Sequence, residues 1–158
     1  TIVFLGATGV GKTVLFSRLF RNKFPETVHS MEEEYLKTTQ LSRSRTKPTV
    51  TPFNAVVLPG NPRLQTLHNK YLPNAAGLVL VVDARHPDVK GTAATLCQLL
   101  TNKIVDEHCP PILIACTKND VAKQDSDFPK RFLRSLEAEL DILKTSFSSG
   151  TCTQACVC

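Results

Sequence analysis

Gly6-Ala7-Thr8-Gly9-Val10-Gly11-Lys12-Thr13 follows the pattern of a phosphate-binding loop, or P-loop: one glycine, four residues, then Gly-Lys-Thr. Its three glycines permit backbone turns that are closed to residues with a Cβ atom. Successive backbone N–H groups of such a loop point inward and cradle phosphate oxygens. Lys12 is expected to reach the β- and γ-phosphates as a point charge, and the Thr13 hydroxyl to bind Mg²⁺. The stretch therefore predicts a nucleotide site to which all eight residues contribute.

The residues on both sides of this loop support the same interpretation. Thr1–Leu5 is an apolar, β-branched run, which predicts a buried strand. After the loop, apolar residues recur at helical spacing and predict a helix over about Lys12–Arg21. The order strand, loop, helix separates a P-loop from a glycine-rich loop that fits the pattern by chance.

The rest of the chain alternates between strand and helix patterns, which predicts a parallel α/β sheet. The further predicted strands are Tyr35–Leu41, as an edge strand, then Thr51–Leu58, Ala76–Asp83 and Pro111–Cys116. Pro59-Gly60-Asn61-Pro62 predicts a turn.

Two apolar patterns with helical spacing predict helices in the second half of the chain. One single helix is predicted to bury Val89, Ala93, Leu96, Leu100 and Ile104. A second is predicted to bury Leu133, Leu136, Leu140 and Leu143, with Ser126 or Asp127 as its cap and Pro129 in its first turn.

Length and composition indicate a single globular domain. The balance is 19 Lys and Arg against 14 Asp and Glu, and the absence of Trp argues against stacking on nucleic-acid bases. No direct nucleic-acid binding is expected. The basic run 42–48 is read as a solvated loop, with contact to anionic lipid or RNA as the alternative. No apolar stretch of this sequence reaches the ~20 residues of a spanning helix, and no signal peptide is expected within it.

The cysteines divide into two groups. Cys97, Cys109 and Cys116 are expected to be small buried apolar residues of a reducing compartment. We expect residues 1–148 to form a GTP-binding domain that is incomplete at its C-terminus, and residues 149–158 to be a disordered tail containing Cys152, Cys156 and Cys158. A metal site or lipidation in this tail is the alternative. The natural N-terminus is expected to lie outside the chain, which opens directly on a strand.

Thr117-Lys118-Asn119-Asp120 follows a predicted core strand and resembles the guanine-specificity motif of small GTPases, Asn-Lys-x-Asp. The Asp120 carboxylate can accept hydrogen bonds from both N1–H and the exocyclic amine of guanine. Adenine lacks this donor pair, and sites built in this way discriminate by ~10⁴-fold. The Lys118 stem is expected to cover the base, and Thr117 stands where the motif has Asn. Ligands of open α/β sheets bind at this carboxyl edge of the strands.

Val57-Leu58-Pro59-Gly60-Asn61 lies where GTPases carry Asp-x-x-Gly-Gln. Gly60 is placed to offer its N–H to a γ-phosphate. Val57 cannot organise the water shell of Mg²⁺, a loss that commonly weakens metal binding ~10–100-fold. Asn61 is one methylene shorter than the glutamine that orients water, so it is a degenerate catalytic residue. Thr27, His29 and Ser30 lie where a Mg²⁺ ligand is expected, and Ser30 is the candidate.

Taken together, these motifs make the chain resemble the β-subunit family of the signal recognition particle (SRP) receptor. The stretches that carry the resemblance are Gly11–Phe20, Leu58–Leu64, Leu113–Asp120 and Leu136–Ser146. The resemblance implies a P-loop NTPase of the small GTPase type, a three-layer α/β sandwich with a mostly parallel sheet. It also implies GTP and Mg²⁺ as cofactors, with stable GTP binding that holds the receptor α subunit, and an N-terminal helix in the endoplasmic reticulum membrane. Family members continue with a further strand, a loop over the guanine and a final helix, which this chain is expected to lack.

The predicted function is that of a GTP-binding receptor subunit with weak intrinsic hydrolysis, acting in co-translational targeting at the cytosolic face of the endoplasmic reticulum. Two alternatives remain open. One is a turnover GTPase of the Arf or Rab type. The other is a degenerate scaffold that binds no nucleotide.

Overall fold

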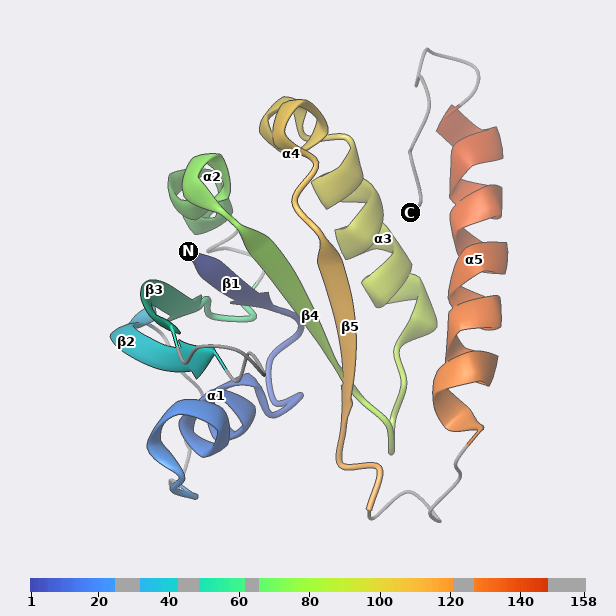
Figure 1. The fold of residues 1–158 in the computed structure, drawn as a ribbon. Helices are drawn as coiled ribbons and strands as arrows, with labels where there is room; N and C mark the ends of the chain where they lie inside the picture. Colours follow the sequence, from blue (N-terminus) through green and yellow to red (C-terminus); the bar gives the residue numbers. More distant parts are fainter. Residues whose placement is uncertain (25–31, 43–48, 62–65, 121–126, 148–158) are drawn as a thin grey trace.

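The computed structural model describes residues 1–24, 32–42, 49–61, 66–120 and 127–147, and these form an α/β sandwich around one sheet (Figure 1). The strands are β1 (Ile2–Leu5), β2 (Glu34–Ser42), β3 (Thr49–Val57), β4 (Gly77–Asp83) and β5 (Ile112–Thr117). The helices are α1 (Lys12–Arg21), α2 (Thr66–Tyr71), the 3₁₀ turn η2 (Leu72–Asn74), α3 (Val89–Leu100), α4 (Lys103–His108) and α5 (Phe128–Phe147).

The sheet has the strand order β2-β3-β1-β4-β5. β1 lies between β3 and β4 and runs parallel to both, and β5 runs parallel to β4. β2 is antiparallel to β3 and forms one edge, as predicted for this segment. Within the described residues, β5 forms the other edge. The predicted mostly parallel α/β sheet is therefore confirmed.

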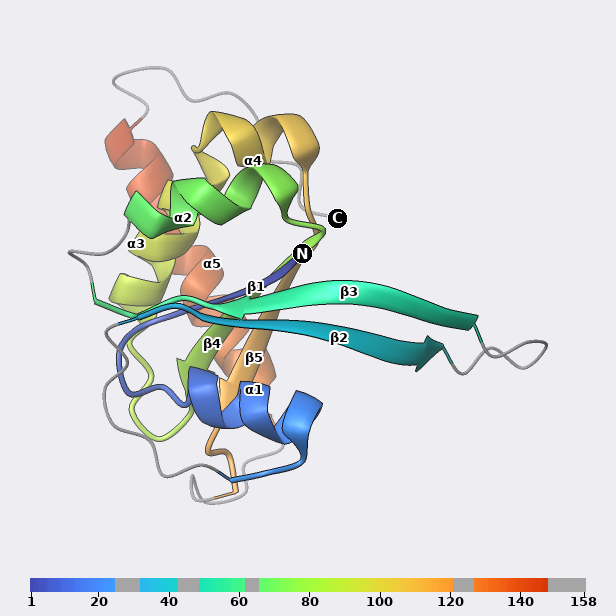
Figure 2. The same ribbon diagram turned by 90° about the vertical axis from the view of Figure 1, so that its left-hand side faces the viewer.

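Helices cover both faces of this sheet, which gives the predicted three layers (Figure 2). α1 lies against one face, where Phe4, Phe16, Ala55, Val57 and Val81 form an apolar cluster. The rings of Phe4 and Phe16 meet edge to face, with centroids 5.6 Å apart. The other face carries the larger cluster, to which α3, α4 and α5 contribute. Successive residues of β1 face opposite layers, so the strand is buried on both sides, as its unbroken apolar run predicts.

The helix predicted over residues 89–104 is wrong in one respect, because the structure divides it into α3 and α4. Asn102 adopts an extended conformation, and its side-chain oxygen accepts a hydrogen bond from the Ile104 N–H at 3.0 Å. An asparagine in this position caps a new helix. The apolar spacing runs on across the break, since Val105 of α4 packs into the same core cluster. α2 and η2 were not predicted at all.

The buried face of α5 also differs from the prediction. Leu133 is 46% exposed, whereas Phe132 is 5% and Leu136 is 1% exposed. Leu140 and Leu143 pack against the core, as predicted, together with Phe128. The face of the helix that packs on the core therefore contains residues 128, 132, 136, 140 and 143, with Phe132 in place of Leu133. Pro129 lies in the first turn as predicted, and Ser126 lies outside the described residues.

This corrected face gives a first prediction. Leu136→Ala is expected to lower the free energy of unfolding by ~2–5 kcal/mol, because a buried leucine leaves a cavity. Leu133→Ala, the matched control in the same helix, is expected to cost less than about 1 kcal/mol. Urea unfolding followed by circular dichroism measures both. Equal losses in the two variants would contradict the orientation of α5.

The three cysteines of the described residues differ in their exposure. Cys97 and Cys116 are partly buried and Cys109 is exposed, and all three are free thiols. The prediction that the three are buried is therefore wrong, because Cys109 ends α4 in a left-handed turn at the surface.

In the part of the chain that the structure describes, no helix is both long and apolar enough to cross a membrane. The basic run 43–48 and the tail 148–158 lie outside the described residues.

Candidate functional site

The P-loop joins the end of β1 to the start of α1 and has the backbone that its glycines predict. Gly6, Gly9 and Gly11 have φ angles of 138°, 79° and 95°, which favour glycine. A Cβ atom at Gly6 would lie 2.4 Å from the carbonyl oxygen of Val81 in β4. The loop therefore lies against the end of the sheet, and a side chain at Gly6 would force the two apart.

Lys12 is turned back into the loop. Its ammonium group donates to the carbonyl oxygens of Gly6 at 3.0 Å and of Ala7 at 2.8 Å. The residue is only 7% exposed, and burial lowers the pKa of its amine to about 8. A cation held in this way is poorly solvated, so an anion within the loop would be strongly attracted to it.

The lowered pKa of Lys12 gives a second prediction. The unfolded chain holds this proton up to its ordinary pKa of 10.5, whereas the fold releases it at about pH 8. Since the unfolded state then binds more protons, stability is expected to rise between pH 8 and 10.5, by at most roughly 3 kcal/mol. Thermal unfolding of the nucleotide-free protein and of Lys12→Met across this range isolates the effect. An identical pH dependence in both proteins would contradict the burial of this charge.

The segment after β3 lies directly on the P-loop. A Cβ atom at Gly60 would come within 2.4 Å of the Ala7 carbonyl carbon and of the Thr8 backbone nitrogen. Asn61 lines the same cavity as the loop, so the structure brings Gly60 and Asn61 to the predicted phosphate region. Val57 is 2% exposed and belongs to the apolar cluster under α1. A carboxylate at position 57 would have to enter that cluster.

The close approach of Gly60 gives a third prediction. Gly60→Ala is expected to lower the free energy of unfolding by ~1–3 kcal/mol, because the new methyl group forces two backbone segments apart. Gly77→Ala is the matched control, since the nearest atom to its added methyl lies at 3.7 Å. Chemical unfolding of both variants measures the difference. A Gly60→Ala protein as stable as Gly77→Ala would show that this loop does not rest on the P-loop.

The end of β5 reaches the P-loop from the other side. The Thr117 hydroxyl lies 2.5 Å from the Val10 carbonyl oxygen and 3.0 Å from that of Val82. The Lys118 ammonium donates to the Gly9 carbonyl oxygen at 2.7 Å. Thr117 and Lys118 lie more than 100 residues after the loop in the sequence. Threonine, which stands where the motif has asparagine, can tie the loop to the sheet through its hydroxyl.

Asp83, which the sequence analysis missed, completes this junction at the end of β4. Its Oδ2 accepts a hydrogen bond from the Lys118 ammonium at 2.6 Å. Burial acts to raise the pKa of Asp83, but hydrogen bonds from Lys118 and Arg85 outweigh it and hold the pKa at about 2. The sequence held one signal that could have identified Asp83: it is the single carboxylate at the end of an otherwise apolar strand.

Asn119 and Asp120 complete the Thr117–Asp120 segment. Asp120 is exposed and ends the described segment. The Oδ1 atom of Asn119 is buried and has no hydrogen-bond partner among the described residues. Thr27, His29 and Ser30 lie outside the described residues, so Ser30 stays a prediction. Thr13, the other predicted Mg²⁺ ligand, is the second residue of α1. The described residues contain no cluster of three or more His, Cys, Asp or Glu that could hold a metal.

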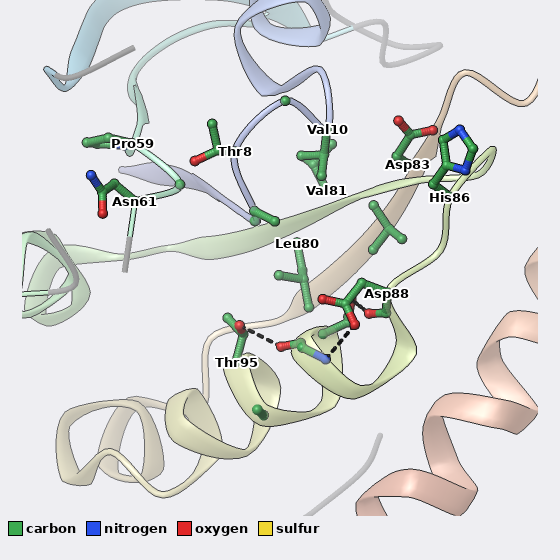
Figure 3. A pocket seen from close by; sticks show the side chains of 18 of the residues that line it. Thr8, Val10, Pro59, Asn61, Leu80, Val81, Asp83, His86, Asp88 and Thr95 are labelled. Atoms are coloured by element: carbon green, nitrogen blue, oxygen red, sulfur yellow. Dashed lines mark hydrogen bonds between the residues drawn. The ribbon is translucent and has the colours of Figure 1, made fainter. Parts of the chain in front are cut away.

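A cavity of about 610 Å³ opens between the P-loop, the segment 59–61 and α3 (Figure 3). The figure shows Thr8, Pro59 and Asn61 on one side of it and Thr95 of α3 on another. His68 of α2, also missed from the sequence, lines this cavity. Burial lowers the pKa of His68, and the positive charge of Lys12 adds to this. Lys12, Thr13, Thr117 and Asp120 are not part of the lining, so the cavity adjoins the predicted site on its α3 side.

The residues present fit a phosphate group. The three left-handed glycines shape a backbone cradle, and a Cβ atom at Gly6 would disrupt it. The N-terminal end of α1 adds further N–H groups, which favour an anion. Within the described residues, the ammonium group of the buried Lys12 donates to the carbonyl oxygens of Gly6 and Ala7, and an anion could replace them. The arrangement is therefore suited to hold an anion at the P-loop, and Thr117–Asp120 places polar side chains beside it.

Comparison with known proteins adds a family to this geometry. A family model described as "Signal recognition particle receptor beta subunit" matches residues 1–151. The SRP receptor β subunit of Mus musculus is 30% identical over 158 residues, and that of Homo sapiens is 31% identical over 156 residues. Both alignments cover 96% of this chain but only 55% of the relative. The chain thus spans about half the length of the curated relatives it matches.

Solved structures agree with the sequence comparison. A structure of the mammalian SRP receptor matches with a TM-score of 0.76 and 28% identity, over 97% of this chain and 79% of that one. A complex described as SRb-GTP/SRX from Chaetomium thermophilum matches with a TM-score of 0.72 over 94% of this chain and 81% of that one. Its 18% identity supports the fold alone.

Proposed function

The chain belongs to the β-subunit family of the SRP receptor, and from this premise we propose that it binds GTP through the P-loop and the Thr117–Asp120 segment. The observation that carries the proposal is the buried Lys12, whose ammonium group donates to two backbone carbonyls of the glycine loop and to no anionic group of the described residues. Burying a cation in this way is costly unless a ligand of opposite charge completes the site. A triphosphate supplies such a charge.

The roles of the individual residues follow from their positions. Backbone N–H groups of Gly6–Thr13 would bind phosphate oxygens, and Lys12 would exchange its two carbonyl partners for them. Thr13, at the start of α1, would ligate Mg²⁺, which when bound neutralises phosphate charge. Lys118 would cover the base and Asp120 would read its edge. Gly60 lies on the loop backbone and would meet the end of the phosphate chain.

We expect hydrolysis to be weak. Catalysis of phosphoryl transfer depends on groups that position water and stabilise charge. Val57 is buried in the apolar cluster under α1 and offers no carboxylate to the site. Asn61 faces the cavity but is one methylene shorter than glutamine. Binding depends instead on the loop backbone, so it should persist where turnover does not.

The wider role is part of the same proposal. The Chaetomium structure is described as a GTP-bound β subunit in complex with SRX, and the mammalian structure as an SRP receptor. By family membership, the GTP-bound form of this chain would hold the receptor α subunit during co-translational targeting. The domain would then lie at the cytosolic face of the endoplasmic reticulum membrane, to which an N-terminal anchor would attach it.

Two measurements on the full-length protein test this function. Equilibrium titration should give tighter binding of GTP than of ATP, and single-turnover hydrolysis should be slow. A hydrolysis rate like that of ordinary small GTPases would favour the Arf- or Rab-type alternative. Absence of binding to either nucleotide would favour the degenerate scaffold.

A further inference from the structure

Lys118 has a backbone conformation that requires support from its surroundings. Its φ angle is 58°, in the left-handed region that residues with a Cβ atom seldom adopt. Such conformations persist where neighbouring groups fix them. The ammonium group provides two anchors, the Asp83 carboxylate at 2.6 Å and the Gly9 carbonyl at 2.7 Å. The side chain is thus stretched between the end of β4 and the P-loop.

Asp83 is itself firmly placed. It is the last residue of β4 and pairs in register with Thr117, whose carbonyl accepts a hydrogen bond from Ala84 at 2.9 Å. The Oδ1 atom of Asp83 accepts a hydrogen bond from the Arg85 backbone N–H at 2.9 Å. Only 12% of the Asp83 side chain and 27% of the Lys118 side chain are exposed. Figure 3 shows Asp83 beside His86, with Asn61 at the opposite side of the cavity.

We propose that Asp83 is a positioning residue for guanine recognition, holding the Lys118 ammonium at the Gly9 carbonyl so that the lysine stem covers the base beside Asp120. The inference rests on the proposed function and adds to it a residue that need not touch the nucleotide. Asp83 would act on the base half of the site, whereas Lys12 acts on the phosphate half.

The negative charge of Asp83 is the property that this role requires. Hydrogen bonds between ionised groups are shorter and stronger than neutral ones. The pair is largely shielded from water, so removal of the carboxylate charge leaves an ammonium that is poorly compensated. The guanidinium of Arg85, 3.4 Å from the same carboxylate, adds a second cation to the junction. An amide at position 83 keeps an acceptor but not the charge, and the Lys118 stem is then no longer fixed.

A matched control lies five residues further on. Asp88 lines the same cavity, and its Oδ1 atom accepts a hydrogen bond from the Gly91 N–H at 2.9 Å, which caps α3. Asparagine caps a helix as well as aspartate does. Asp88→Asn therefore removes the same charge near the site without affecting the partners of Lys118.

The test compares three ligands that share phosphates but differ in the base: GDP, inosine diphosphate and inorganic pyrophosphate. Their affinities are measured by isothermal titration calorimetry on the full-length protein, in wild type, Asp83→Asn, Asp83→Glu and Asp88→Asn. Asp83→Asn is expected to weaken both nucleotides by the same factor, roughly 10–100-fold, and pyrophosphate by less than about threefold. Asp83→Glu should recover part of the loss, and Asp88→Asn should match wild type.

Two outcomes would overturn the inference while the proposed function stands. One is GDP affinity in Asp83→Asn equal to that of wild type. The other is a parallel fall in pyrophosphate affinity, which would indicate a general collapse of the site. A wild-type protein that binds no GDP would contradict the proposed function itself.

A double-mutant cycle covers the case in which Asp83→Asn does not fold. Lys118→Met is expected to weaken GDP binding by a factor similar to that expected of Asp83→Asn, and larger than that of the less disruptive Asp83→Glu. Combining either change with Lys118→Met should add little further loss, because both act through one contact. Additive losses would show that Asp83 does not act through Lys118.

Discussion

Lys12→Ala is expected to abolish measurable GTP binding while the domain stays folded. Truncating one member of a buried charge pair commonly costs 2–5 kcal/mol, so the affinity should fall at least ~30-fold and up to several thousand-fold. The fold is not expected to depend on this side chain, because its ammonium group donates to two carbonyls of the loop itself. Removal of a costly buried cation can even stabilise the nucleotide-free protein.

Titration with a fluorescent GTP analogue measures the loss, and thermal unfolding followed by circular dichroism verifies the fold. Lys130→Ala serves as the control, since its side chain is 79% exposed on α5. Retained GTP binding in Lys12→Ala would mean that the P-loop is only a structural turn. A variant that no longer melts cooperatively would show that Lys12 is needed for folding.

Asp120→Asn is expected to change which base the protein prefers, from guanine towards xanthine. The carboxylate accepts hydrogen bonds from two donors of guanine, and the amide of asparagine presents a donor where xanthine offers a carbonyl. Sites that read a base through buried polar groups discriminate by ~10⁴-fold, so the GTP to XTP preference should change by several orders of magnitude. The Asp120 side chain is exposed, so the substitution should leave stability unchanged.

Competition between GTP, XTP and ATP for the purified variant measures this preference. Asp106→Asn on α4 is the control, because Asp106 is exposed and does not line the cavity by the P-loop. If Asp120→Asn and wild type bind all three nucleotides equally, Asp120 does not read the base.

Most of the fold of this chain could be predicted from local sequence patterns. The strand, glycine loop and helix of residues 1–21 could be predicted because the apolar run, the positive-φ positions and the helical spacing all lie within one short window. β4 and β5 were predictable from their apolar composition, since strands buried on both faces tolerate little else. In each case the residues that set the structure are close in sequence.

The errors have physical causes in longer-range contacts. The break at Asn102 was missed because the apolar spacing continues across it and only the side-chain cap at the Ile104 N–H reveals it. Leu133 was assigned to the core because four leucines share helical spacing, but α3 packs against the stripe that contains Phe132. Spacing alone does not say which of two adjacent stripes faces a neighbouring helix.

The site divides in the same way. The P-loop and the Thr117–Asp120 segment could be found as motifs, yet the ion pair that joins them could not. Asp83 and Lys118 are 35 residues apart on different strands, and only the register of β4 with β5 brings them together. The close approach of Gly60 to the Ala7–Thr8 backbone likewise depends on how β3 ends beside β1.

If this chain binds guanine nucleotide as proposed, the purified protein should carry it. Full-length protein is denatured without added nucleotide, and the released small molecules are separated by chromatography and quantified against protein. We expect close to one equivalent of GDP and GTP together in wild type and almost none in Lys12→Ala. Adenine nucleotide in wild type, or no nucleotide together with no GTP binding on titration, would contradict guanine nucleotide binding by this chain.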